Sequence, residues 1–257
     1  MNILTRIFVS SSLCFFLMSS SGYSETERIR VVYTDWFPYT YEENGEALGF
    51  EIEIFREVIK KMNLEADFVR FPWKRCLNSL EEGTADALIS LLKTPEREKY
   101  TYFPEESISI SRTVFFTEKD RRIEYYGSYD LLRGYTVGVI MGFSYGHEFD
   151  NADYLFKDPA RDAQTLITML LKGRHDLAAE NQAVVNGYAM KMGVSDKIRF
   201  LEPPIHSQKL YAGFSRRKGL KKLCDDFSGS LFEFKKTETY SNILKKYGIS
   251  PSQMADN

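Results

Sequence analysis

The sequence predicts an α/β protein built from two α/β units with a ligand cleft between them. Strand-like and helix-like segments alternate over the first hundred residues, a pattern that predicts a parallel sheet with helices on both faces. A second alternation begins near residue 135 and ends in a helical tail. Two such units leave a cleft between them, and clefts of this kind are common small-molecule sites.

The elements of the first unit follow from hydrophobic periodicity and turn residues. Asn44-Gly45 is a pair that tolerates positive φ and predicts a turn, and Gly83 is expected to end a helix. The predicted elements are a strand at 29–34, a helix at 50–62, a strand at 66–71, a helix at 74–82 and a buried strand at 85–91.

The second unit and the tail follow from the same signals. Apolar residues at three- and four-residue intervals after residue 220 predict a helix there. The predicted elements are a strand at 135–141, a helix at 160–171, a strand at 176–179, a helix at 182–192, a strand at 208–214 and tail helices at 220–234 and 240–247.

The chain opens with a predicted secretory signal at residues 1–24. Arg6 precedes an apolar run, and small residues lead to a cleavage site after Ser24. The apolar run is short for a membrane span, although an uncleaved anchor remains the alternative. This segment predicts export to the periplasm.

Charge and cysteine content exclude several classes. The formal net charge of −2 gives no case for nucleic acid or an anionic membrane as a partner. Beyond the signal only Cys76 and Cys224 remain, and they predict either a disulfide or two buried thiols. No Cys or His pair has the spacing of metal ligands, so no metal or cofactor is expected.

Ligands of open α/β sheets sit at the carboxyl ends of the strands. This rule selects five loops, "YTDWFPY", "FPWKR", "SLLKTPER", "GFSYG" and "AENQ". In the third loop Arg97 follows a proline break. It either forms a local ion pair with Glu96 or Glu98, or points into the cleft toward an anion.

The ordered segments "WFPYTYEENGEALGFEIEI", "LNSLEEGTADALIS", "KTPEREKYTYFP" and "LLRGYTVGVIMG" resemble the extracellular solute-binding proteins of amino-acid ABC transporters. The resemblance implies a type II periplasmic binding-protein fold, with two α/β lobes joined by a two-segment hinge near residues 112–117 and 211–215. Lobe 1 would comprise residues 25–114 and 213–257, and lobe 2 would comprise residues 115–212.

The resemblance also implies a ligand site. Arg97 stands where the family clamps the α-carboxylate of its ligand, a task that suits the guanidinium fork. Ser90 matches a ligand-holding position, with a strand-end cap as its alternative. Trp36 and Trp73 would wall the pocket, unless they are core residues. Ser144 lies in a donor-rich turn that suits a carboxylate.

Two positions, Leu92 and Asn181, depart from the family pattern, and Leu92 stands where the family often carries a second hydroxyl. The lobe 2 acid that holds an ammonium aligns with Asn181, flanked by Glu180, and an amide cannot neutralise an ammonium. Either Glu180 substitutes, or the ligand is not a standard α-amino acid. Arg75 adds a second positive group beside Arg97 or is solvated on its helix; two arginines would suit a more negative ligand.

Three alternatives keep the fold and change the function. "GFSYG" matches the G-x-S-x-G turn of serine hydrolases, with Ser144, Asp176 and His206 in a permitted order. A dehydratase of cyclic acids would need an acid or base such as Glu180. A sensor would present its ligand to a membrane receptor. The favoured prediction is a monomeric, non-enzymatic periplasmic protein that captures a small carboxylate for an ABC permease.

Overall fold

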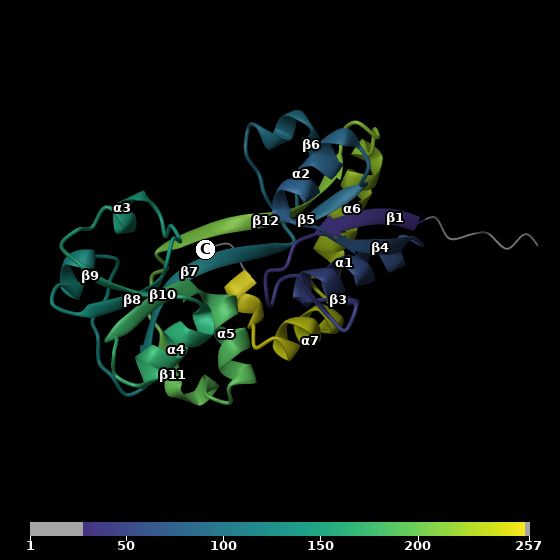
Figure 1. Ribbon diagram of the computed structural model, residues 1–257. Helices are drawn as coiled ribbons and strands as arrows, with labels where there is room; N and C mark the ends of the chain where they lie inside the picture. Colours follow the sequence, from purple (N-terminus) through teal and green to yellow (C-terminus); the bar gives the residue numbers. More distant parts are fainter. Residues whose placement is uncertain (1–27, 255–257) are drawn as a thin grey trace, which may run out of the picture.

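A single mixed sheet runs through the whole molecule. The computed structural model describes residues 28–254, so the predicted signal peptide lies outside the described residues. The ten-stranded sheet has the order β4-β1-β5-β12-β7-β10-β8-β9, with β6 beside β12 and β11 beside β7. Two groups of elements are joined by the long strands β7 and β12 (Figure 1).

The sheet consists of two parallel halves and an antiparallel centre. The first half-sheet contains β4 (Glu65–Arg70), β1 (Arg28–Tyr33) and β5 (Ala87–Leu92). The second half-sheet contains β10 (Leu177–Asn181), β8 (Thr136–Ile140) and β9 (Phe156–Ala160). Between them, β12 (His206–Ser215) and β7 (Ser109–Glu118) pair with each other and with their outer neighbours in antiparallel fashion.

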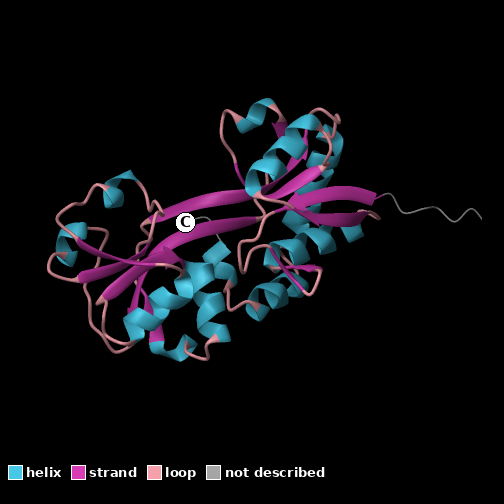
Figure 2. Ribbon diagram, viewed as in Figure 1, coloured by secondary structure: helices cyan, strands magenta, loops and turns pink. Residues whose placement is uncertain are grey.

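Helices cover both faces of each half-sheet (Figure 2). Alternate residues of β1 enter different clusters: Val31 packs with one buried cluster and Val32 with another, as expected for side chains on opposite faces. The helices are α1 (Phe50–Lys61), α2 (Trp73–Glu82), α3 (His147–Asp150), α4 (Ala163–Leu171), α5 (Gln182–Lys191), α6 (Lys221–Phe234) and α7 (Glu238–Lys246).

Short elements complete the fold. The hairpin β2–β3 turns at Asn44-Gly45, where both residues have positive φ, so the predicted turn is confirmed. The remaining elements are β2 (Tyr41–Glu43), β3 (Glu46–Leu48), β6 (Thr101–Tyr102), β11 (Ile198–Phe200), and the 3₁₀ turns η1 (Arg97–Lys99), η2 (Tyr129–Leu132), η3 (Ser195–Lys197) and η4 (Pro251–Met254).

The predicted order of elements is confirmed, with two corrections. The helix predicted at 160–171 begins only at Ala163, because the Asp162 carboxylate caps it by accepting the Thr165 N–H at 2.7 Å. The residues before the cap form β9 instead. The parallel sheet predicted for the first hundred residues is confirmed for β4, β1 and β5; the second correction is β7, an antiparallel strand that the pattern did not predict.

The central strands contain the predicted hinge segments. Residues 112–117 lie within β7 and residues 211–215 lie within β12. The two strands pair directly from Ser109 opposite Leu210 to Thr113 opposite His206. The lobe boundaries at residues 114 and 213 stay predictions.

Both described cysteines are free thiols, which confirms the alternative of two buried thiols. Cys76 packs with the α2 side of the first half-sheet and Cys224 with the α1 side. Burial raises the pKa of Cys76 to about 11 and that of Cys224 to about 12. Both groups are therefore protonated at neutral pH and pack as small apolar side chains.

Candidate functional site

The carboxyl ends of the two half-sheets face each other. In the sheet order β5, β12, β7, β10, each strand is antiparallel to the next. β5 and β10 therefore run in opposite directions, and both end near the place where the two half-sheets meet. Leu92 at the end of β5 lies opposite Leu210, and Asn181 at the end of β10 lies opposite Thr113, which pairs with His206. Four residues of β12, about 13 Å of strand, separate the two ends. The loops that follow these strands are called the interlobe site below.

Arg97 lies at the start of η1, just after the proline break. Its Nη1 donates to the Leu92 carbonyl at 2.9 Å, and its guanidinium lies 5.4 Å from the centre of the Trp73 ring. Among residues 28–254 no carboxylate lies within ion-pair distance of Arg97, and Glu98 pairs with Lys93 at 3.2 Å. The alternative of a local ion pair with Glu96 or Glu98 is therefore wrong. The half-buried guanidinium keeps donors available for an anion.

Arg75 and Trp73 lie on the same helix but have different surroundings. Trp73 is partly buried and contacts Arg97. Arg75 is exposed, and its guanidinium stacks 3.9 Å from the centre of the Phe71 ring. The structure thus brings together Arg97 and Trp73. Arg75 is solvated on its helix, which was the second of the two possibilities predicted for it.

Ser90 is held by a carboxylate that the sequence did not single out. Ser90 is a buried residue in the left-handed region, with φ of 64°, and its hydroxyl donates to Glu51. Ser109 donates to the other oxygen of the same carboxylate. Glu51 is fully buried at the start of α1. Its hydrogen bond with Ser90 therefore holds the end of β5 against α1. The role of Ser90 in binding stays a prediction.

Trp36 belongs to a packed aromatic turn. Its ring stacks on Tyr39 with centroids 4.1 Å apart and planes at 10°, and its backbone bridges to Thr40. Tyr39 is fully buried. Trp36 is partly buried, so one face is used for packing. Whether its edge contacts a ligand stays a prediction.

Asn181 is committed to protein partners. Its Oδ1 accepts the Val184 N–H at 3.1 Å and so caps α5. Its Nδ2 donates to Ser111 Oγ at 2.9 Å and to the Tyr39 hydroxyl at 3.0 Å. Tyr39 comes from the loop after β1, so this amide ties the two ends of the interlobe site together. The sequence alone could not show this role of Asn181, because it depends on the contact between Tyr39 and the end of β10.

Glu180 is also buried, with 5% of its surface exposed. Its Oε1 accepts the N–H of Asn181 at 2.6 Å. In the described part of the chain no Lys or Arg lies within ion-pair distance of it. Burial raises the pKa of Glu180 to about 7. Such a carboxyl group can pair with an ammonium only by giving up its proton inside the protein, and burial makes this ionisation costly.

Ser144 is exposed on the loop after β8, and its hydroxyl donates to Asp150 Oδ2 at 2.5 Å. Asp176 instead accepts the Thr136 N–H at 2.6 Å and pairs with Arg121. His206 is exposed on β12. Ser144, Asp176 and His206 therefore do not form the hydrogen-bonded triad that a serine hydrolase needs.

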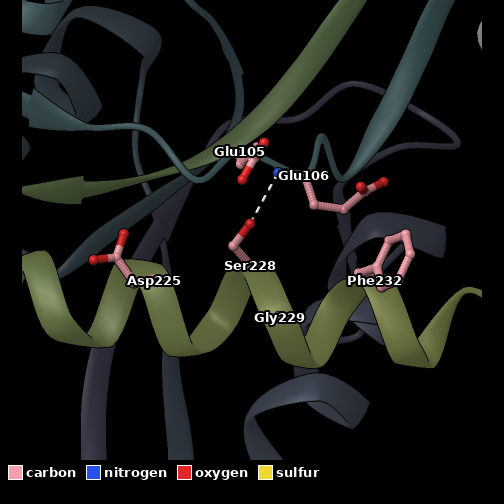
Figure 3. A pocket seen from close by; sticks show the side chains of 6 residues that line it. All are labelled: Glu105, Glu106, Asp225, Ser228, Gly229 and Phe232. Carbon is pink, nitrogen blue, oxygen red and sulfur yellow. Dashed lines mark hydrogen bonds between the residues drawn. The ribbon is translucent and has the colours of Figure 1, made fainter.

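A separate surface pocket lies over α6 (Figure 3). Asp225, Ser228 and Phe232 of α6 line it together with Glu105 and Glu106, and Ser228 Oγ accepts the Glu106 N–H at 2.9 Å. None of the predicted site residues lines this pocket. Three carboxylates line it, two of them paired with lysines, and no arginine is among the lining residues, so it offers a carboxylate ligand no clamp of the predicted kind.

The buried acids predict a pH dependence of stability. Burial raises the pKa of both Glu51 and Glu180 to about 7. An acid with a raised pKa holds its proton in the folded state where the unfolded chain has lost it, so the free energy of unfolding falls as pH rises from about 4.5 to about 7. Each group contributes up to about 3 kcal/mol. We expect urea unfolding to show greater stability at about pH 5 than at about pH 7.5.

Glu180→Gln provides the control for this prediction. The neutral amide can still accept the Asn181 N–H, so the variant should lose its share of the pH dependence and keep the fold. A slope equal to that of the unmodified protein would contradict the assignment to Glu180.

The comparisons with known proteins identify the family. The family model of bacterial extracellular solute-binding proteins, family 3, matches residues 29–250. A probable amino-acid-binding protein, YxeM of Bacillus subtilis, is 22% identical over 214 residues, which are 82% of this chain and 80% of that protein. The histidine-binding periplasmic protein of Escherichia coli K12 is 23% identical over 209 residues, covering 79% and 80%.

Solved structures agree on the fold. The unliganded open form of the L-cystine solute receptor of Neisseria gonorrhoeae has a TM-score of 0.73 at 20% identity, covering 90% of this chain and 96% of that one. Within residues 28–254 no helix is both long and apolar enough to cross a membrane. The two-lobed periplasmic binding-protein fold is confirmed, and the chain belongs to family 3 of the bacterial extracellular solute-binding proteins.

Proposed function

We propose that this protein captures a small carboxylate-bearing ligand, an amino acid or a related compound, in the interlobe site. The observation that carries the proposal is the Arg97 guanidinium, which is half-buried against Trp73 and donates to the Leu92 carbonyl. It also lies beside the Tyr100 hydroxyl, and no carboxylate among residues 28–254 forms an ion pair with it. A guanidinium without a carboxylate partner can donate two parallel hydrogen bonds to the carboxylate of a ligand. Membership of a family of solute-binding proteins supports the same function.

The other site residues have supporting roles in this proposal. Ser90 offers its backbone at the end of β5, because its hydroxyl is bonded to Glu51. Ser144 offers donors from the loop after β8 when it releases Asp150. Trp36 and Trp73 form the aromatic wall. Lobe 1 then comprises residues 25–114 and 213–257, and lobe 2 comprises residues 115–212.

Export and delivery complete the proposal. Relatives include a periplasmic histidine-binding protein and the arginine-binding extracellular protein ArtP of Bacillus subtilis. We infer that residues 1–24 direct export, that the mature protein works as a monomer, and that an ABC permease receives the ligand. No observation favours an enzyme or a receptor-coupled sensor: the serine triad is not assembled, and the relatives named here are binding proteins.

Thermal unfolding tests this function. The full chain is exported by a bacterial expression host, co-purifying ligand is removed, and the protein is melted with amino acids, small di-acids and cyclic acids. A true ligand at a hundred times its dissociation constant should add about 2.7 kcal/mol to the free energy of unfolding. A cooperatively folded protein that no member of the panel stabilises would contradict the proposal.

A further inference from the structure

We propose that the ligand is a carboxylate with an apolar body and no free ammonium group, such as an aryl- or alkyl-substituted alkanoate. This inference rests on the proposed function, because it assumes that the interlobe site binds a carboxylate through Arg97. The charges and apolar groups around that site indicate which carboxylates can bind there.

The end of β10 offers an ammonium one buried carboxyl group and no free amide. The Asn181 amide caps α5 and donates to Ser111 and Tyr39, so its hydrogen-bonding groups are used. The Glu180 carboxyl is 5% exposed and bonded to the backbone of its own neighbour. An ammonium brought to this place would lose its water, and its partner Glu180 would have to give up a proton inside the protein, so the pair forms at a cost.

The opposite end of the site is positive. The Arg97 guanidinium contacts the Leu92 carbonyl, the Trp73 ring and the Tyr100 side chain. Glu51 of α1, whose carboxylate lies beside the end of β5, is fully buried and accepts hydrogen bonds from two serine hydroxyls. A monoanion therefore matches this end of the site.

The loop after β8 exposes large apolar side chains. Met141 is 66% exposed and Phe143 is 62% exposed. This loop leaves the carboxyl end of β8, which runs parallel to β10, and so it lies on the edge of the second half-sheet that faces the first. Exposed apolar groups at such a place suggest contact with an apolar partner.

Aromatic rings stand on the other side of the junction. Trp73 is partly buried beside Arg97. Phe103 and Tyr211 are also partly buried and meet edge to face with centroids 5.7 Å apart, and Tyr211 lies opposite Leu91 near the end of β5. A ligand whose carboxylate sits on Arg97 can thus place an apolar body between these rings and the loop that carries Phe143.

Calorimetric titration with matched compounds tests the proposal. 3-Phenylpropanoate and L-phenylalanine differ only in the α-ammonium, and 4-methylpentanoate and L-leucine form a second pair. We expect the amine-free member of at least one pair to bind at least about tenfold more tightly than its partner, because the ammonium's partner, Glu180, must first ionise in a buried setting. Acetate should bind far more weakly than either alkanoate, because it has no apolar body.

Phe143→Ala should weaken 3-phenylpropanoate binding about tenfold. Phe156→Ala is the matched control: Phe156 is 68% exposed but starts β9 at the amino end, so its loss should leave affinity unchanged. Equal losses in both variants, or none in Phe143→Ala, would overturn the apolar wall.

The outcomes separate the two proposals. If L-phenylalanine or L-leucine binds more tightly than its amine-free analogue, the ligand class is wrong and the carboxylate-binding function stands. If neither these compounds nor the broader panel binds to the folded protein, the proposed function fails, and this inference fails with it.

Discussion

Arg97→Ala should abolish ligand binding at concentrations that saturate the unmodified protein. Removing one partner of a hydrogen-bonded charge pair costs about 2–5 kcal/mol, a loss of roughly 30- to 5000-fold in affinity. The fold should survive, since the Arg97 side chain is half-buried and contacts only nearby groups, a backbone carbonyl and the side chains of Trp73 and Tyr100. Titration calorimetry with a ligand found by thermal melting measures the loss.

Two control variants show whether the loss of binding is specific to the Arg97 guanidinium. Arg75→Ala removes a guanidinium that is exposed and stacks on Phe71, so it should leave affinity nearly unchanged. Arg97→Lys keeps the charge and loses the planar fork, so an intermediate affinity is expected. Normal binding by Arg97→Ala would show that the carboxylate clamp lies elsewhere.

Gly49→Ala should be among the most destabilising small substitutions in the chain. Gly49 has φ of 119° and ψ of 154°, a conformation that is nearly restricted to glycine. A Cβ built there would lie 2.2 Å from the Tyr39 carbonyl oxygen, which accepts the Glu51 N–H at 3.2 Å. Backbone strain and overpacking together cost about 3–5 kcal/mol. Denaturant unfolding measures this loss.

Gly229→Ala is the counterpart of this substitution. Gly229 is an exposed residue within α6, and an added Cβ meets no atom within 4 Å. Alanine should therefore stabilise the protein by about 0.5–1 kcal/mol through its higher helix propensity. If both alanine variants were equally stable, the close approach of Gly49 to the Tyr39 carbonyl would be refuted.

The sequence predicted those elements whose pattern is local. The apolar spacing after Phe50 and the Gly83 stop were sufficient for α1 and α2. β7 was missed because most of its side chains are apolar or buried on both faces, which leaves no two-residue alternation to read. β9 was missed because Pro159 interrupts it and weakens any strand pattern.

The site was predictable where one residue type suits one chemistry. Arg97 and Trp73 were both selected from loops at strand ends, and the structure brings them into contact. The carboxylate of Glu51 and the commitment of Asn181 could not be found in this way. Both depend on partners distant in sequence, with Ser109 58 residues from Glu51 and Tyr39 142 residues from Asn181, and no local pattern encodes such contacts.

The place of β12 in the sheet also governs the order in which the chain can fold. This strand is the last in the sequence, yet it lies between β5 and β7 near the middle of the sheet. During synthesis the β5 edge of the first half-sheet therefore stays unpaired until β12 has left the ribosome. Because these pairings are far apart in sequence, they form slowly. A chain with this topology therefore stays without its completed core for most of its synthesis.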